Sequence, residues 1–378
     1  MSGADHRDET RPEQSPAEQA SRRDVRIDRP HEFLANLLYK ANRSLAGYAA
    51  TDLLGTTPDA AASFPPDPFQ AWQDLLAGRL EELAAAVVAE RPQLFVRQVQ
   101  WSKTVHSARG VSSEHLRAGL RALRHTLSNE LPEAYRPIGA AYLDQALAEF
   151  DREPSDIAPL TPYTPDGHLA SEYLLAILEG DRRHASRVIF DAIQDGQTVP
   201  NLYLNVLTPV QVEVGRMWLA NEITVAEEHF ASTTTKMMVA QLRPYAQFPP
   251  CHGKILVAAA VDGNLHDLGV QIVTNFFEMD GWRVIYLGAS MPIEDLVLAV
   301  NFYKADLLAL SVALTTQLPT LHATIEAVRQ SELGSTVKVL AGGGALAGWG
   351  DLAQQFGADA YAADAVEAVA VGNRLSGR

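Results

Sequence analysis

The last third of the chain consists of short, continuously apolar segments that alternate with helical ones. The apolar segments predict strands at 255–261, 284–287, 307–313, 337–341 and 360–362. Helices are predicted between them, through Phe277 and over 293–300, 321–328 and 345–356, with a terminal helix after the last strand. Strands without a polar face are typical of a parallel sheet with helices on both sides. We therefore expect an α/β, Rossmann-like (flavodoxin-like) domain with a five-stranded parallel sheet over 252–378.

The residues before 252 divide into further regions by composition. Residues 1–28 combine charged side chains with Pro, Ser and Gln, and predict a disordered arm. Residues 29–155 carry apolar side chains at helical spacing and predict an all-helical, sensor-like N-terminal domain. Its helices are expected to begin at Asp67-Pro68, a typical helix start, and to run through 95–105, 116–127 and 138–147. Residues 156–165, rich in proline, predict a linker.

Residues 166–248 predict a four-helix bundle. The segments 169–178, 185–193 and 202–219 have helical periodicity. Thr224 is followed three residues later by Glu227, which is the pattern of a capping box at the start of the fourth helix. Short loops between helices of this length favour an antiparallel bundle.

The charge balance restricts the partners of the chain. Its 31 basic and 46 acidic residues give a net charge of -15 over 378 residues, which disfavours nucleic acid and anionic membrane surfaces. The single cysteine, Cys251, permits no internal disulfide and no thiolate metal site. No segment approaches the roughly 18 apolar residues of a membrane span, and no signal peptide is seen. We expect a cytoplasmic protein.

Ligands of a parallel sheet bind at the carboxyl ends of its strands, and three loops there carry a recognisable pattern. The first loop contains His266 and Gly269, the third strand ends at Ser311, and the fourth ends at Gly342-Gly343. The gaps are 41 residues (270–310) and 28 residues (314–341). This arrangement resembles the cobalamin-binding domain family, whose pattern is D-x-H-x-x-G, S-x-L and G-G at such spacings.

The resemblance implies that His266 is the lower axial ligand of cobalt and displaces the nucleotide base of the cofactor. An imidazole nitrogen is a good ligand for cobalt. Glycines allow close backbone approach, so Gly269, Gly342 and Gly343 are expected to line the slot for the displaced base, with Ser311 as a hydrogen-bonding group. Asp267, beside the ligand, is expected to contact the cofactor as well.

Two positions depart from the family pattern. Asn264 replaces the usual Asp, and Ala313 replaces the usual Leu. The Asp normally accepts a hydrogen bond from the ligand histidine and tunes it. Asn264 can accept but carries no charge, which weakens a proton relay and argues against cobalt cycling between oxidation states in methyl transfer.

The bundle carries a second resemblance. Trp218 is followed after nine positions (219–227) by Glu228 and His229. This pattern is similar to that of cobalamin-dependent photoreceptors such as the light-responsive repressors of carotenoid synthesis. It implies a bundle that caps the upper face of adenosylcobalamin. Trp218 would pack on the adenosyl group, and Glu228 would form a hydrogen bond with it. Those repressors have a His after the Trp, where this chain has Leu219.

The region 29–155 lacks the DNA-binding pattern of those repressors. The combination resembles photocobilins, which pair a cobalamin photoreceptor core with biliverdin. Candidate bilin contacts are Trp101, His106 and Arg109, which lie on or near one face of a predicted helix. Cys251 could attach a bilin covalently, although a lone cysteine before a strand is more often inert.

These resemblances imply a light-sensing signalling protein without enzymatic activity. Photolysis of the cobalt–carbon bond is expected to change domain packing and the assembly of a homo-oligomer, and to signal through an unidentified partner protein. The alternative is a corrinoid methyl-carrier protein of a methyltransferase system. A radical-mutase module is disfavoured, because a substrate barrel of about 250 residues has no room in this chain.

Overall fold

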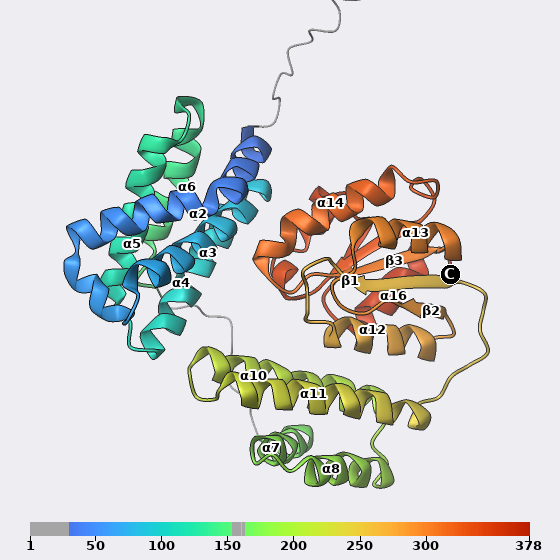
Figure 1. The fold of residues 1–378 in the computed structure, drawn as a ribbon. Coiled ribbons are helices and arrows are strands. Elements are labelled where there is room, and N and C mark those ends of the chain that lie inside the picture. The colour runs from blue at the N-terminus through green and yellow to red at the C-terminus, as the bar shows by residue number, and fades with distance from the viewer. Residues whose placement is uncertain (1–29, 153–159, 161–162) are drawn as a thin grey trace, which may run out of the picture.

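The computed structural model describes residues 30–152, 160 and 163–378 (Figure 1). The predicted arm at 1–28 and most of the predicted linker at 156–165 lie outside the described residues. Figure 1 shows a helical region from the N-terminal half on one side, the sheet with its helices on the other, and a helix bundle that lies along both. Within the described ranges, no helix is long and apolar enough to cross a membrane.

The N-terminal region is entirely helical where it is described, as the sequence predicts. Its elements are α2 (Pro30–Thr56), η1 (Pro58–Ser63), α3 (Pro68–Val88), α4 (Pro92–Ala108), α5 (Ser113–Glu130), η2 (Glu133–Tyr135) and α6 (Arg136–Ala148). Asp67 caps α3 by accepting from the Gln70 backbone N–H, which confirms the predicted start. The core is centred on Trp72, whose indole is fully buried and donates to the Ala60 carbonyl at 3.0 Å.

The bundle contains α7 (Pro165–Leu178), α8 (Arg182–Gln194), α9 (Val199–Leu202), α10 (Thr208–Leu219) and α11 (Val225–Leu242), followed by η4 (Arg243–Tyr245). The capping box of Thr224 and Glu227 is present. The predicted helical segment over 202–219 is confirmed, although its part after α9, η3 (Tyr203–Leu207), is π-helical. The backbone N–H and the hydroxyl of Thr208 both donate to the Tyr203 carbonyl, the hydroxyl at 2.7 Å, and the following Pro209 has no N–H to donate.

The sheet is parallel throughout, with strand order β2-β1-β3-β4-β5. Its strands are β1 (Ile255–Ala260), β2 (Arg283–Tyr286), β3 (Leu307–Ser311), β4 (Lys338–Gly342) and β5 (Ala360–Ala362). This is the flavodoxin-like order, in which the strand order reverses between β1 and β3 and ligands bind at the strand ends there. The register pairs Ala260 with Ser311 and Ser311 with Gly342, so the three loops of the predicted site leave the sheet side by side.

Helices cover both faces of the sheet. They are α12 (Leu268–Met279), α13 (Ile293–Tyr303), η5 (Thr315–Gln317), α14 (Leu318–Arg329), η6 (Gly344–Leu346), α15 (Asp351–Gln355) and α16 (Ala365–Leu375). The predicted helix over 345–356 is wrong in its first half. Gly348 has a positive φ of 79°, which ends the short turn of η6 and delays the helix to Asp351.

The bundle packs on the sheet region through α12. Ile272 from α12 and Ala365 from α16 belong to the same buried cluster as the core of the bundle. The bundle and the carboxyl edge of the sheet therefore share one boundary, and the predicted cofactor residues lie on both sides of it.

Candidate functional site

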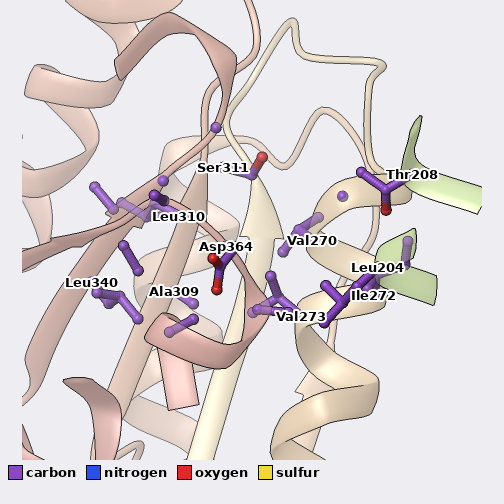
Figure 2. Close-up of a pocket in the computed structure, with 18 residues that line it drawn as sticks. Leu204, Thr208, Val270, Ile272, Val273, Ala309, Leu310, Ser311, Leu340 and Asp364 are labelled. Atoms are coloured by element: carbon purple, nitrogen blue, oxygen red, sulfur yellow. The ribbon is translucent and has the colours of Figure 1, made fainter. Parts of the chain in front are cut away.

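A cavity of about 200 Å³ opens at the carboxyl ends of β3 and β4 (Figure 2). It runs between the sheet, α12 and α16, and all four residues that the sequence assigns to a base slot line it: Gly269, Ser311, Gly342 and Gly343. Its other walls are mainly apolar side chains. A cavity of about 150 Å³ is large enough to bind benzene, so this one has room for a fused two-ring base.

The two glycines after β4 are required by a close approach of the backbone. A Cβ on Gly343, which has a φ of 109°, would lie 2.2 Å from the Val312 carbonyl oxygen. A Cβ on Gly342 would lie 3.0 Å from the Ala362 carbonyl oxygen. Gly269 differs, because a Cβ there would meet no protein atom within 4 Å. Its missing side chain therefore leaves open space for a ligand, while the other two let the strand ends pack.

Three groups at the cavity were not predicted from the sequence. Leu204 and Thr208 reach it from the bundle, and Asp364 points into it from the start of α16 (Figure 2). Asp364 caps α16 by accepting from the Glu367 backbone N–H at 2.8 Å. The pattern Asp-x-x-Glu after the last strand is a helix-start signal, and it could have placed Asp364 at the same edge as the other loops.

His266 lies in the loop between β1 and α12 and is exposed. The loop is fixed by Asn264, which is fully buried. Its amide oxygen accepts from the His266 backbone N–H at 3.0 Å, and its amide nitrogen donates to the Ser311 carbonyl at 3.1 Å. Asn264 therefore joins the loops after β1 and β3. An ionised Asp could not donate the hydrogen bond to the Ser311 carbonyl.

Asp267, directly after His266, connects this loop to the bundle. Its carboxylate forms an ion pair with Lys236 of α11 and accepts from the Tyr286 hydroxyl at 2.9 Å. Burial raises the pKa of this carboxyl, but the hydrogen bonds from Lys236 and Tyr286 outweigh burial and hold the pKa below its ordinary value. Asp267 is thus a charged clamp between α11 and the loop that carries His266.

The bundle residues of the predicted upper face lie at the end of α10 and the start of α11. Trp218 is half-buried, and the Glu228 carboxylate accepts from Ser232 at 2.6 Å and from His229 at 2.5 Å. Burial raises the pKa of Glu228, but its hydrogen bonds with Ser232 and His229 outweigh burial and lower the pKa below its ordinary value.

The three candidate bilin contacts belong to α4 and its end, but they do not share one environment. Trp101 is half-buried. His106 bonds to the Ser102 carbonyl at 2.8 Å, and burial lowers its pKa against the effect of that bond. Arg109 instead contacts the bundle, with its guanidinium over the Trp218 ring. Cys251 is an exposed free thiol. Bilin binding by these residues stays a prediction.

The residues present fit a corrinoid with a displaced base. The exposed imidazole of His266 provides the single nitrogen donor that a cobalt already held in a macrocycle needs from the protein. The glycine-lined cavity, which Gly269 borders three residues further along the chain, provides an apolar slot. The bundle face with Trp218 and Glu228 provides an aromatic and a carboxylate surface.

Comparisons with known proteins agree with this geometry. Residues 254–370 and residues 169–243 each match a family model described as a B12 binding domain. Dimethylamine corrinoid protein 1 of Methanosarcina acetivorans is 32% identical over 167 residues, which cover 44% of this chain and 75% of that protein. A corrinoid protein of Desulfitobacterium hafniense is 28% identical over 216 residues, covering 56% of this chain and 98% of that protein.

A solved structure supports the fold. The Methanosarcina barkeri monomethylamine corrinoid protein aligns with a TM-score of 0.51 and 20% identity, covering 56% of this chain and 99% of that one. Both family matches lie after residue 168, in the bundle and the sheet region.

Proposed function

The chain belongs to the family of cobalamin-binding corrinoid proteins, and from this premise we propose that it binds a corrinoid with its base displaced, with His266 as the lower ligand of cobalt. The observation that carries the proposal is the cavity at the carboxyl ends of β3 and β4, because the four residues of the base-slot pattern come from three separate parts of the chain and line one space. The displaced base would enter between Gly269 and Gly343. Ser311 and Asp364 are the polar groups available to it.

For the finer function we propose light sensing with adenosylcobalamin. Bound adenosylcobalamin supplies a weak cobalt–carbon bond that visible light breaks. Trp218 would cover the adenosyl group with its indole face, and Glu228 would accept hydrogen bonds from the ribose. After illumination Trp218 would lose its packing partner and Glu228 its donors, and the bundle would repack against the sheet.

The N-terminal helices support this choice. The match to 98% of the Desulfitobacterium protein covers 56% of this chain, so the remainder has no counterpart in that alignment. Helices of that extra region contact both the bundle and the sheet loops, through Arg109 on Trp218 and through Gln98 on Thr315. A carrier has to present its cobalt to a separate enzyme. A region of the same chain that contacts the cap would obstruct the access of that enzyme.

A bilin, downstream signalling and assembly belong to the same proposal. Biliverdin would bind among the N-terminal helices near Trp101 and His106, with Arg109 as a further contact. The protein would form a homo-oligomer whose assembly changes with light and would signal to a partner protein without catalysing a reaction itself. These features extend the resemblance to photocobilins.

The second candidate is a corrinoid methyl carrier, and the relatives favour it over light sensing. The matching proteins are named as dimethylamine and monomethylamine corrinoid proteins. In that role the bundle would move aside so that a methyltransferase could reach the cobalt. Both candidates share the site at His266 and differ in what covers the opposite face.

Reconstitution with adenosylcobalamin in the dark, followed by green light, distinguishes them. A light sensor changes its elution volume in size-exclusion chromatography as well as its absorption spectrum, while an unchanged elution volume would favour the carrier. Addition of biliverdin with detection of red absorbance tests the bilin separately.

The ligand assignment has its own test. The variant His266→Ala should lose the absorption spectrum of a cobalt with a nitrogen lower ligand from the protein, while His168→Ala, an exposed histidine of α7, should keep it. An unchanged spectrum in His266→Ala would refute the assignment.

A further inference from the structure

Two helices end against each other where the N-terminal region meets the bundle. Arg109 follows the end of α4, and its guanidinium donates to the carbonyl oxygens of Trp218 at 2.9 Å and Leu219 at 3.1 Å, at the end of α10. It also donates to the Val105 carbonyl of its own helix at 2.9 Å. The centre of the guanidinium lies 5.4 Å from the Trp218 ring.

The physical reason for this contact is that carbonyl groups at a helix end can accept further hydrogen bonds. The last carbonyls of an α-helix have no intrahelical donor, and the helix dipole places partial negative charge there. Two such ends would repel each other. Arg109 places one permanent positive charge between them and bonds to carbonyls of both helices. Its contact is therefore specific for the end of α10, which is formed by Trp218 and Leu219.

The same N-terminal region is attached to the sheet on its other side. Arg91 forms an ion pair with Asp351 at 2.7 Å. Gln98, on the same helix as Arg109, donates to the Thr315 hydroxyl at 2.9 Å, just beyond the loop that begins at Ser311. Helix α4 thus joins the loop edge of the sheet to the end of α10, and a shift of Trp218 relative to the sheet has to change the contact at Arg109.

We propose that Arg109 is a positioning residue of the corrinoid site, which holds Trp218 over the upper face of the cobalt and makes the N-terminal helices respond to the group bound there. The proposal rests on the proposed binding of a corrinoid and holds for a sensor and for a carrier. Arg109 touches Trp218 by both its ring and its carbonyl, so the side chain fixes where the indole lies. A large upper group would press on Trp218, and a small one would leave it free to move.

The test compares two corrinoids in the dark, adenosylcobalamin with a large upper group and hydroxocobalamin with a small one. Spectroscopic titration gives the dissociation constant of each for the full chain. In Arg109→Ala we expect adenosylcobalamin to bind about fivefold more weakly, which corresponds to about 1 kcal/mol, while the constant for hydroxocobalamin stays unchanged. Arg109→Lys keeps the charge but not the fork of donors. Its dissociation constant for adenosylcobalamin should lie between those of the wild type and of Arg109→Ala.

Arg91→Ala is the matched control, because it removes an arginine that joins the N-terminal helices to the sheet region and does not touch Trp218. It should leave the ratio of the two constants as in the wild type. Circular dichroism checks that each variant folds. If Arg109→Ala weakened the binding of both corrinoids equally, its role would be merely structural and the proposal would be overturned. An unchanged dissociation constant for both corrinoids would overturn it as well.

Hydrogen exchange gives a second readout that does not depend on affinity. In the wild type, amides at the end of α4, around Val105–Arg109, should exchange at different rates with the two corrinoids bound. In Arg109→Ala this difference should disappear. If the wild type binds corrinoid and the rates do not differ, only the role of Arg109 fails. If the wild type binds neither corrinoid, the proposed function fails and this inference falls with it.

Discussion

Replacing Asn264 by Asp restores the residue of the cobalamin-binding pattern, yet the structure predicts that it destabilises this protein. Asn264 is fully buried and uses both ends of its amide, one as an acceptor from the His266 backbone and one as a donor to the Ser311 carbonyl. An ionised Asp keeps the first bond and loses the second. A carboxylate oxygen would then face the Ser311 carbonyl oxygen in a site without solvent.

The expected cost follows from the lost donor and the buried charge. An unsatisfied buried polar group costs about 1–3 kcal/mol, and more when charged, so we expect about 3 kcal/mol at pH 7.5. For a region of this size that corresponds to a fall in Tm of about 9 °C. The variant is compared without cofactor by differential scanning fluorimetry. Asn205→Asp, at an exposed position, is the matched control and should change stability by less than about 0.5 kcal/mol.

The pH dependence tests the mechanism. In the variant Asn264→Asp, burial against a carbonyl raises the folded pKa of the introduced carboxyl above its unfolded value of about 3.9. A protonated carboxyl can donate to Ser311 as the amide does, so the variant should approach wild-type stability below about pH 4 and lose stability as the pH rises. If the variant is as stable as the wild type at pH 7.5, the amide of Asn264 does not bridge the two loops and the reasoning is refuted.

Three further changes test other parts of the structure. Gly343→Ala should cost about 3 kcal/mol in unfolding free energy and weaken corrinoid binding, because its Cβ meets a backbone carbonyl oxygen, while Gly288→Ala, strained in φ but unobstructed, should cost less. Lys236→Met breaks the ion pair with Asp267 and should weaken corrinoid binding about tenfold in a spectroscopic titration, and an unchanged constant would contradict the clamp. Burial raises the pKa of Glu82 to about 7. The contribution of its protonated form to the free energy of unfolding is therefore fully present below about pH 4.3 and is lost as the pH rises to about 7. Glu82→Gln should flatten the dependence of Tm on pH in this window, and an unaltered slope would show that another group causes the dependence.

The sheet and the base slot could be predicted because parallel strands impose them. Continuous apolar runs separated by helices identify the strands, and the carboxyl ends of neighbouring strands meet at one edge. Gly269, Ser311 and Gly343 are far apart in the chain but line one cavity for this reason. Spacing along the sequence therefore carried most of the information about this half of the site.

Contacts between the regions could not be predicted in the same way. Lys236 reaches Asp267, and Arg109 reaches Trp218, from helices whose periodicity shows only that they are amphipathic. Which turn of a helix meets which loop depends on how the regions dock. The π-helical turn at η3 was not predicted, because the apolar spacing of the segment continues across Pro209 without a change.

A sensor and a carrier are expected to differ more in these contacts between regions than in the slot for the displaced base. The slot needs only the loops of the sheet, which both kinds of protein require. Access to the upper face depends on whether α10 and α11 can leave the sheet. Here α11 is tied to the loop of His266 by Lys236 and Asp267, and the end of α10 is tied to the N-terminal helices by Arg109. If the proposed corrinoid binds under this cap, opening the cap would have to break both contacts, and we expect a change at its upper face to reach the N-terminal helices.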